Sequence, residues 1–482
     1  LSQFYGIEID DFAGEIAKLA LWLAEHQMNV EFRKEFGRTN PTLPLTEAGK
    51  IVIGNACRLD WEEVCPKNED EEIYILGNPP YLGARMQQDN HNADMDFVFS
   101  SFKNHGDLDY IAIWFFKAAK YIRGINSKCA FVTTNSISQG IQVGLLWPNI
   151  FNLDIEIDFA HTSFKWVNNA KSNAGVTVAI IGLANSSKSI KRIFSNGMEK
   201  QVNGINAYLT DGGKTIIQRR SKPISNFNEM SFGNMPNDGG GLILSEEEKN
   251  ILLSENPEAR KYIKKLLGAQ EFIHGQIRYC LWISDKEKVN AEKIPFIENR
   301  IKNVKEYREK STRATTRNLA KVYYRFGEIR HKESSQIIIP RVSSERRDYI
   351  PSGFLEIDTI ISDSALAIYD AESWLFGILN SKMHMVWLRA IGGKLEERIR
   401  YSKDIVYNTF PFPPISTQRK NEITQSVFRI LEEREKHSDK TLAQLYDPDK
   451  MPDGLREAHR QNDIIIEKCY RSTPFTSDEE RL

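Results

Sequence analysis

The chain has 482 residues, which at roughly 150 residues per domain predicts about three domains and a large buried core. Its 64 Lys and Arg residues and 65 Asp and Glu residues give a formal net charge of −1, which excludes a generally basic, histone-like binder but not a local basic surface. Five scattered cysteines without a C-x-x-C pair argue against a disulfide framework and a zinc site. The sequence has no apolar run of about 18 residues, which argues against a membrane span. Because it also has no signal peptide, we predict a cytoplasmic protein.

The first third of the chain alternates strand-like and helix-like stretches. Residues 11–28 carry an apolar helical stripe (Phe12, Ile16, Leu19, Ala20 and Leu23) with Asp10 or Asp11 as N-cap, and residues 107–123 form a second helix-like stretch. Six apolar runs predict strands, at residues 3–9, 51–54, 73–77, 129–134, 155–160 and 176–183. The last two are continuous enough to be buried on both faces, as in a mostly parallel sheet flanked by helices. The sequence therefore predicts an α/β fold.

The composition changes near residue 186, where Asn185-Ser-Ser-Lys-Ser189 ends the sheet pattern and Gly, Asn and Pro become frequent. After Pro414 the pattern becomes helical and charged, with apolar residues at 423, 427, 430 and 431 and a second helix over 455–470. We therefore predict an α/β domain over residues 1–186, an α+β domain over 187–414 and a helical segment over 415–482. The pattern does not decide whether this last segment is scaffold or clamps a partner.

The tetrapeptide Asn78-Pro79-Pro80-Tyr81 directly follows the predicted strand at 73–77. Two prolines cannot continue a hydrogen-bonded ladder, so the chain leaves the sheet at the edge where open α/β sheets bind ligands. The Asn78 amide oxygen and the Pro79 carbonyl can accept both hydrogens of an exocyclic amino group while the Tyr81 ring stacks on the base. This directs the nitrogen lone pair at an electrophile without a general base. An isolated motif of this kind fits a plain strand-to-helix turn equally well.

Two further strand ends carry polar groups that suit a nucleoside. Glu8, followed by Ile9, ends a strand just before a helix, where a carboxylate can accept both hydroxyls of a ribose. Taken alone, this acid also fits a helix cap. Asn55, followed by Ala56, ends the next strand, and its amide can reach an adenine edge. The three strand ends, in the order ribose, adenine and reactive amine, describe one cofactor beside one substrate.

These motifs resemble those of DNA amino-methyltransferases that use S-adenosylmethionine: FYGIEID resembles their ribose-binding motif and NPPY their catalytic motif. Further blocks extend the resemblance over essentially the whole chain to the MmeI-type family of restriction-modification proteins, in which one chain both cuts and methylates. These blocks are GNACRLDW, ILGNPPYLGARMQ, FVTTNSISQG, FAHTSFKW, FGNMPNDGGGLILSEEE, GAQEFIHGQIRYCLWISD, SSERRDYIP, YNTFPFP and LYDPDKMPDGLREAH. The resemblance implies a class I methyltransferase sheet for DNA adenine N6, an α+β target recognition domain and a helical C-terminal segment.

The resemblance also implies residue roles. Base flipping is expected because N6 of a stacked adenine is out of a cofactor's reach. Phe164 or Trp166 takes the place of an aromatic that sandwiches the flipped base with Tyr81, although core packing explains both rings equally well. The implied catalytic residues are Asn78, Pro79, Pro80 and Tyr81, and the implied cofactor-binding residues are Glu8, Ile9, Asn55, Ala56 and Asn78.

The family's glycine-rich turn after the first strand, which holds the methionine part of the cofactor, has no counterpart in this sequence. Gly239-Gly240-Gly241 does not replace it, since no strand-like run precedes it and no helix follows. The chain starts at Leu1, just past the expected place of that turn, so we expect it to begin inside a longer gene product and to bind S-adenosylmethionine weakly or not at all. The family's nuclease with its metal-binding acids is also absent, and we predict no metal ligands.

A local basic excess predicts a DNA-reading middle domain. Residues 298–348 hold fourteen Lys and Arg but seven Asp and Glu, which suits phosphate neutralisation and predicts steep salt dependence. Arginines in residues 341–347 can grip guanine O6 and N7, and a glutamate there can accept from cytosine N4, although any single arginine also fits a solvated loop. Residues 398–402 form a second candidate set. The predicted contacts to double-stranded DNA are Arg313, Arg317, Arg341, Ser344, Glu345, Arg346, Arg347 and Arg400.

Two other interpretations stay open. Protein-glutamine and RNA amino-methyltransferases present an amide or amine to the same motif, although the long stretch after residue 186 favours a DNA reader. The chain alone is also compatible with a DNA-binding module without catalysis. A cytosine-C5 enzyme is disfavoured because its Pro-Cys nucleophile is missing, Cys65-Pro66 having the reverse order. The sequence determines neither the recognition site, nor the oligomeric state, nor whether a nuclease of the parent protein is active.

Overall fold

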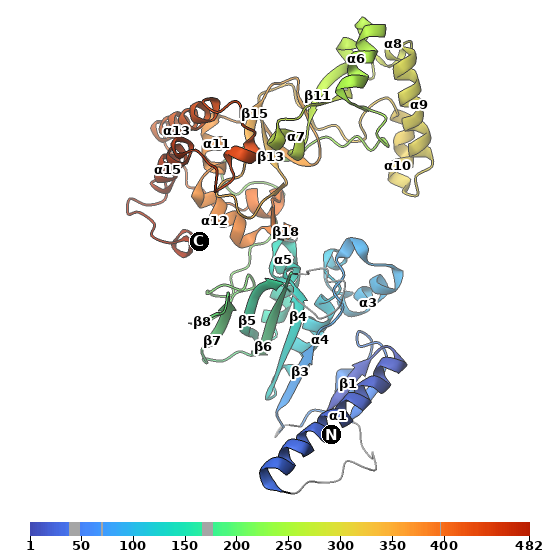
Figure 1. Cartoon of the computed structure of the whole chain (residues 1–482), viewed down its shortest axis with the longest axis vertical. Helices are drawn as coiled ribbons and strands as arrows, with labels where there is room; N and C mark the ends of the chain where they lie inside the picture. Colours follow the sequence, from blue (N-terminus) through green and yellow to red (C-terminus); the bar gives the residue numbers. More distant parts are fainter. Residues whose placement is uncertain (38–48, 69–70, 166–176, 396) are drawn as a thin grey trace. The chain divides into compact units, whose positions relative to one another are not determined.

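The computed structural model of the chain describes residues 1–37, 49–68, 71–165, 177–395 and 397–482 (Figure 1). These residues form two compact units, Leu1–Ile216 and Ile217–Leu482, each with its own sheets and helices. Within the described ranges, every helix is too short or too polar to cross a bilayer.

The first unit is built around a six-stranded sheet with the order β3-β4-β6-β5-β7-β8. β3 is parallel to β4 and β5 is parallel to β7, while β6 and β8 run antiparallel to their neighbours, so four of these six strands share one direction. This mixed sheet confirms the predicted α/β fold. The strands are β3 Ile73–Gly77, β4 Ser127–Thr134, β5 Ile155–Lys165, β6 Thr177–Asn185, β7 Lys191–Ser195 and β8 Met198–Val202.

Apolar helices pack on this sheet and form its core. In α4 (Ala112–Ile122), the Phe115 ring packs edge-on against Phe131 of β4 and Trp147 of α5 (Gly140–Phe151), with ring centroids 5.3 and 6.2 Å apart. α4 begins later than the predicted start at residue 107, because a 3₁₀ turn ends at Asp107 and the Asp109 side chain accepts the N–H of Ile111. α3 (Asp89–Phe99) packs beside α4.

A separate two-stranded parallel sheet holds the N-terminal strands. β1 (Tyr5–Glu8) pairs with β2 (Lys50–Ile53), and the predicted helix α1 (Asp11–Phe36) follows β1; of the two N-cap candidates, Asp10 is the one that caps it. α1 packs on β2 through Gly14, which leaves no room for a Cβ beside Ile53. The apolar stripe of α1 faces solvent instead, with Phe12 73% and Leu23 54% exposed. The periodicity therefore predicted the helix correctly but not the face that packs on β2, which is the face that carries Gly14. A short helix, α2 (Trp61–Val64), follows β2.

The polar run at residues 185–189, predicted as the end of the sheet pattern, is a turn within the first unit. The Nζ of Lys191 is fully buried, donates to both Ser187 and Ser189, and lies 2.6 Å from an oxygen of Glu156. β7 and β8 follow this turn in the same sheet, and the compact unit ends at Ile216 rather than at residue 186. The division of the chain into three domains remains a prediction.

The described residues of the second unit form three smaller sheets, with the strand orders β10-β12-β11-β16, β15-β13-β17-β9 and β14-β19-β18. β13 and β17 are buried at every residue because they are the central strands of their antiparallel sheet. The strands are β9 Met230–Phe232, β10 Ile243–Leu244, β11 Ile263–Leu267, β12 Arg278–Leu281, β13 Gln336–Pro340, β14 Val342–Ser343, β15 Gly353–Leu355, β16 Ile360–Ile361, β17 Ala365–Tyr369, β18 Gly393–Leu395 and β19 Arg398–Arg400.

The helices described in the second unit form two groups along the chain, at residues 246–318 and 373–481. α13 and α15 lie where the sequence predicted helices and pack against each other, with Ile423, Val427 and Ile430 buried. The helices are α6 Glu246–Glu255, α7 Ala269–His274, α8 Lys288–Ala291, α9 Pro295–Glu309, α10 Ala314–Asn318, α11 Ser373–Leu379, α12 Lys382–Ile391, α13 Thr417–Glu435, α14 Leu442–Leu445, α15 Asp453–Glu467 and α16 Asp478–Arg481.

Candidate active site and DNA-reading surface

The NPPY tetrapeptide leaves the sheet directly after β3, as the two prolines predict. The last strand residue, Gly77, is in register with Phe131 of β4, and an added Cβ would lie 3.3 Å from that ring. Asn78 and Pro80 are exposed and Pro79 is buried, while the partly buried Tyr81 ring packs against the core of the unit. The motif is therefore anchored at one end and open to solvent at Asn78, as a site for an incoming base requires.

Leu82, the residue after the tetrapeptide, is fixed by both of its backbone groups. Its N–H donates to Asp109 Oδ1 at 3.0 Å, and its carbonyl accepts from the N–H of Tyr110 at 3.1 Å and from Gln87 Nε2 at 3.0 Å. A residue whose N–H and carbonyl are both hydrogen-bonded has the two adjacent peptide units restrained. The contacts at Leu82 thus define the conformation in which the tetrapeptide is presented.

Asp109 also joins this loop to the loop that follows β4. The carboxylate is buried, and its Oδ2 accepts the hydroxyl of Ser136 at 3.0 Å while Oδ1 holds Leu82. β3 and β4 are parallel neighbours, so both loops leave the same edge of the sheet. Asp109 was not among the residues predicted for the site. An acid just before a helix is usually explained as a cap, and the pattern alone does not show that its second oxygen reaches Ser136.

We expect Asp109→Ala to release the loop at residues 78–82. The change removes the acceptor of the partly buried Leu82 N–H, and the loss of a hydrogen bond to a charged group costs about 1.5–3 kcal/mol. Hydrogen exchange of the Leu82 amide should become about tenfold to a hundredfold faster, because each 1.4 kcal/mol corresponds to a factor of ten. Asp109→Asn keeps one acceptor and should stay near the wild type. Unchanged exchange in the alanine variant, measured beside the exposed control Asp89→Ala, would show that Asp109 does not hold the loop.

The predicted adenine-binding residue Asn55 has a buried partner. Its Nδ2 donates to Asp94 Oδ2 of α3 at 2.9 Å, and its Oδ1 accepts the N–H of Cys57 at 2.8 Å. Asp94 also accepts from Arg58 Nε at 2.6 Å and from the Tyr110 hydroxyl at 2.7 Å. Burial alone would raise the pKa of Asp94, but these three donors lower it below its ordinary value. Each atom of the Asn55 amide still has one further hydrogen-bonding position for a ligand.

Glu8 and Asn55 lie at the same edge of the β1–β2 sheet, because Glu8 is in register with Ile53. Glu8 Oε1 accepts the N–H of Ile9 at 2.8 Å, which turns the carboxylate toward the loop that starts α1. Ile9 is 71% exposed and Ala56 is partly buried, with its carbonyl accepting from Trp61 Nε1. The structure thus brings these four predicted residues to one edge, but in a sheet separate from the one that carries NPPY.

Phe164 lies at the NPPY edge of the large sheet. It pairs with Val178 of β6 after a register shift in β5, and Val178 pairs with Thr134 at the end of β4. β5 runs in the same direction as β3 and β4, so its last residues reach the edge where Asn78 lies. The side chain of Phe164 is partly buried. Trp166, the other predicted stacking residue, lies outside the described residues.

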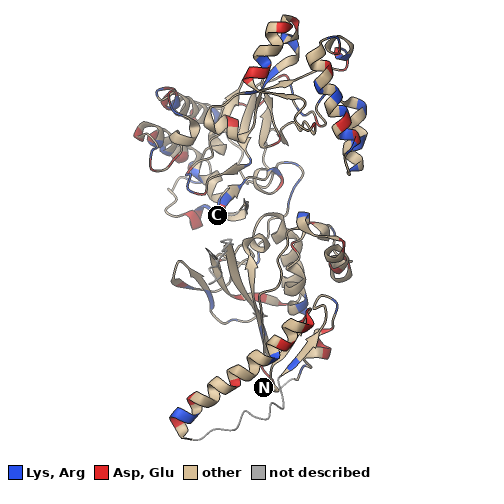
Figure 2. Ribbon diagram, turned by 45° about the vertical axis from the view of Figure 1, so that its right-hand side comes forward, with Lys and Arg blue, Asp and Glu red and all other residues tan. Residues whose placement is uncertain are grey.

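Figure 2 colours the Lys and Arg positions along the ribbon, and the arginines of the basic stretch differ in burial. Arg308 of α9, counted with the phosphate-binding patch, is fully buried and donates to the carbonyls of five residues. That part of the prediction is wrong, because this guanidinium is used inside the fold. Arg313 and Arg317, at the start and within α10, are exposed, with Arg317 Nη1 bonded to the carbonyls of Ser311 and Thr312.

The two predicted base-contacting stretches meet in one small sheet. β14, at residues 342–343, pairs with β19, so Val342 lies opposite Arg400, and the N–H of Tyr401 donates to the carbonyl of Arg341 at 2.8 Å. This pairing brings residues 341–347 and 398–402 side by side, although 50 or more positions separate them in the sequence. The two stretches that the sequence suggested separately are therefore neighbours in the fold.

The predicted DNA contacts on this sheet differ in exposure. Glu345, Arg346 and Arg400 are exposed, and Ser344 is partly buried. Arg341 is partly buried, with its guanidinium 4.9 Å from the centre of the Phe232 ring and Nη1 bonded to the carbonyl of Asp363. Arg347 is partly buried and donates to Ser343 Oγ at 3.2 Å; burial lowers its pKa. The exposed side chains are therefore the better placed of the predicted set to reach a base edge.

Comparison with known proteins defines the class of this chain as a methyltransferase domain followed by a target recognition domain. Family models match three consecutive parts: the MmeI DNA-methyltransferase domain at residues 1–195, the MmeI target recognition domain at 211–414 and the MmeI C-terminal domain at 415–482. The chain belongs to the MmeI family, which confirms the resemblance found in the sequence.

Two relatives are similar over the whole of this chain. DNA methyltransferase A of Bacillus subtilis (strain 168) is 48% identical over an alignment of 484 positions, which covers 100% of this chain and 55% of the relative. The structure of the type IIL restriction-modification enzyme MmeI in complex with DNA matches with a TM-score of 0.94 and 38% identity, and covers 100% of this chain and 65% of that chain. The chain thus spans little more than half the length of the curated relative and less than two thirds of the length of the solved one.

Proposed function

We propose that this chain is the methylating and sequence-reading part of a restriction-modification protein, and that it transfers a methyl group to adenine N6 of double-stranded DNA in the cytoplasm. The observation that carries the proposal is the exposed Asn78 at a proline-stiffened strand end, held by Asp109, in a chain of the MmeI family. The MmeI structure was determined in complex with DNA, which supports the choice of substrate.

In the proposed mechanism the target adenine leaves the stack and enters the NPPY site. The Asn78 amide oxygen and the Pro79 carbonyl accept the two N6 hydrogens, so the N6 lone pair is withdrawn from the ring and becomes nucleophilic. Tyr81 supports one face of the base, and Phe164 is placed at the same sheet edge to support the other. The proton released from N6 passes to solvent through the open side of the site, where Asn78 is exposed.

The residues at the β1–β2 edge fit the nucleoside part of S-adenosylmethionine. In this proposal Glu8 binds the ribose hydroxyls, and Asn55 binds the adenine edge with the hydrogen-bonding positions that Asp94 and Cys57 leave open; the shared position of Glu8 and Asn55 at one sheet edge supports it. When bound, the cofactor supplies an electrophilic methyl group. The described β1–β2 sheet and the NPPY-bearing sheet share no hydrogen-bonded strand. We expect weak cofactor binding by this chain because the glycine-rich turn that would hold the methionine part has no counterpart in the sequence, and micromolar binding in calorimetry would contradict that.

The proposed substrate predicts salt-dependent binding. The exposed cations of α9 and α10 suit phosphate contacts, so duplex affinity should fall about 10³–10⁵-fold between 50 and 200 mM salt if six to ten phosphates are contacted. Gel shifts at several salt concentrations measure the slope. Arg313→Ala should reduce the slope by about one unit without changing sequence preference. A chain that binds no duplex at 50 mM salt would contradict the proposed function.

Methyl transfer itself is tested by incorporation of labelled methyl groups into DNA. A version of the chain extended upstream by roughly one domain's length, about 150 residues, should label duplex DNA. Duplex binding without labelling, even by this extended form, would favour the second candidate, a DNA-binding module without catalysis. The missing counterpart of the glycine-rich turn is the observation that favours this second candidate for the chain as given.

A further inference from the structure

Tyr349 joins the reading loop, defined here as residues 341–349, to the C-terminal helices. The Tyr349 side chain is buried, and its hydroxyl donates to Asp463 Oδ2 at 2.6 Å. Its ring stacks on His459, with centroids 4.1 Å apart and an angle of 20° between the planes. Asp463 and His459 both belong to α15. The end of the loop is therefore fixed on α15 by one short hydrogen bond and one ring stack.

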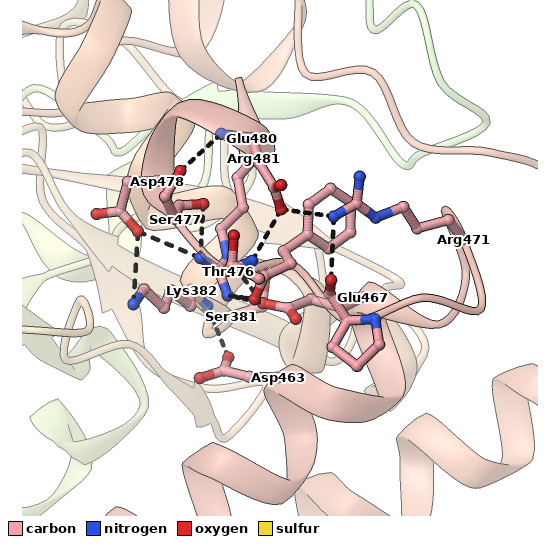
Figure 3. A network of polar contacts seen from close by, with 12 residues as sticks. Ser381, Lys382, Asp463, Glu467, Arg471, Thr476, Ser477, Asp478, Glu480 and Arg481 are labelled. Atoms are coloured by element: carbon pink, nitrogen blue, oxygen red, sulfur yellow. Dashed lines mark hydrogen bonds and ion pairs between the residues drawn. The ribbon is translucent and has the colours of Figure 1, made fainter.

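Asp463 is itself held in place by the start of α12 (Figure 3). Its Oδ1 accepts the backbone N–H of Lys382 at 2.6 Å. Burial raises the pKa of Asp463 to about 7, while the donors Tyr349 and Lys382 act in the opposite direction. A buried carboxylate is retained at low cost only where donors satisfy its oxygens, and here one of the two donors comes from the reading loop. The loop and the carboxylate thus depend on each other.

The last residues of the chain brace the same region (Figure 3). Arg481 of α16 pairs with Glu467 of α15 at 2.7 Å, and both side chains are nearly buried. Asp478 of α16 lies 3.4 Å from Lys382 Nζ. These contacts fold α16 back onto α12 and α15, so the carboxylate that binds Tyr349 sits in a rigid assembly.

Contacts at the exposed part of the loop are weaker. Arg346 pairs with Asp449 at 2.5 Å and Arg456 lies 3.7 Å from Asp348, but these side chains are about half exposed or more. Ion pairs of this kind contribute little to stability. They leave Arg346 able to exchange Asp449 for a base edge, whereas the buried Tyr349–Asp463 bond persists.

We propose that the C-terminal helices set the conformation of the reading loop, and that Tyr349 and Asp463 are positioning residues for base recognition that do not themselves touch DNA. The inference rests on the proposed function, in which residues 341–347 read bases. Side chains that read bases must stay within well under 1 Å of their positions. A loop loosened at Tyr349 therefore loses discrimination between base sequences before it loses phosphate contacts. This gives the helical segment a role in specificity.

The test is selection of bound sequences from a randomised duplex pool by the whole chain, followed by affinity measurements on the selected duplex and on a random duplex. Tyr349→Phe removes only the hydroxyl and keeps the stack on His459. We expect its affinity for the selected duplex to fall about tenfold, the effect of one lost hydrogen bond to a charged group, with unchanged affinity for the random duplex. Tyr470→Phe is the matched control, since it removes a hydroxyl that donates to the Pro411 carbonyl at 2.7 Å, away from the loop.

Asp463 provides an independent arm. Asp463→Ala should relax the selected sequence, whereas Asp463→Asn retains an acceptor for Lys382 and a partner for Tyr349 and should keep the wild-type motif. Wild-type motif and affinity in both Tyr349→Phe and Asp463→Ala would overturn the inference, as would an equal loss on selected and random duplexes. If the wild-type chain binds duplex DNA but selects no sequence, the proposed base recognition by residues 341–347 is wrong. The inference about Tyr349 and Asp463 then fails because its premise fails, whatever the variants show.

Discussion

Asn78→Ala is expected to abolish methyl transfer while leaving DNA binding intact. Asn78 is exposed at the end of β3, so the change removes one of the two acceptors for N6 without disturbing the fold. Loss of a single hydrogen-bonding group that acts in the transition state typically reduces turnover about 10²–10³-fold. Because the lone pair of N6 stays conjugated without that acceptor, we expect the upper end of this range. The measurement is labelled-methyl incorporation by the upstream-extended protein, with duplex affinity measured in parallel.

Asn92→Ala is a suitable control for this experiment, since Asn92 is an exposed asparagine of the same unit on α3. It should retain both transfer and binding. Methylation that survives Asn78→Ala would contradict the assignment of the site, even if the family membership of the chain stands. Loss of duplex binding together with transfer would instead indicate that Asn78 supports the structure of the unit.

The sequence predicted most elements that carry the candidate site. β3 occupies the predicted residues 73–77, and the chain leaves the sheet at the two prolines because their backbone cannot extend the ladder. The N-cap of α1 is Asp10, one of the two candidates that the sequence offered. These features depend on local stereochemistry, which a short stretch of sequence determines by itself.

Features that depend on contacts between distant residues were not predicted. The bond from Leu82 to Asp109 spans 27 positions, and the pairing of Val342 with Arg400 brings together two stretches that the sequence suggested separately. Neither contact follows from periodicity, which reports only that a residue faces inward or outward. The same limit explains why Arg308 was wrongly counted as a phosphate-binding residue. Its position in a basic stretch of sequence does not show whether it binds phosphate or the carbonyls of its own fold.

Arg308→Met is expected to destabilise the second unit strongly. The fully buried guanidinium donates to the carbonyls of Pro236, Asn237, Leu319, Val322 and Arg325, and so ties α9 to the segments before β10 and after α10. Burial lowers its pKa, yet the five acceptors satisfy all of its donors. Methionine fills much of the volume but leaves these carbonyls without a donor. We expect a loss of about 3–5 kcal/mol in the free energy of unfolding, measured by urea denaturation.

Lys302→Met is the matched control, because Lys302 is exposed on the same helix and its replacement should change stability by less than about 0.5 kcal/mol. The comparison also separates structure from DNA binding. Lys302 and the other exposed cations contribute to phosphate contacts, so Lys302→Met should weaken duplex binding at low salt while the protein stays folded. Arg308→Met should weaken binding only as the unit unfolds. A stable Arg308→Met protein with reduced DNA affinity would return Arg308 to the phosphate-binding set and contradict its role as an internal tie.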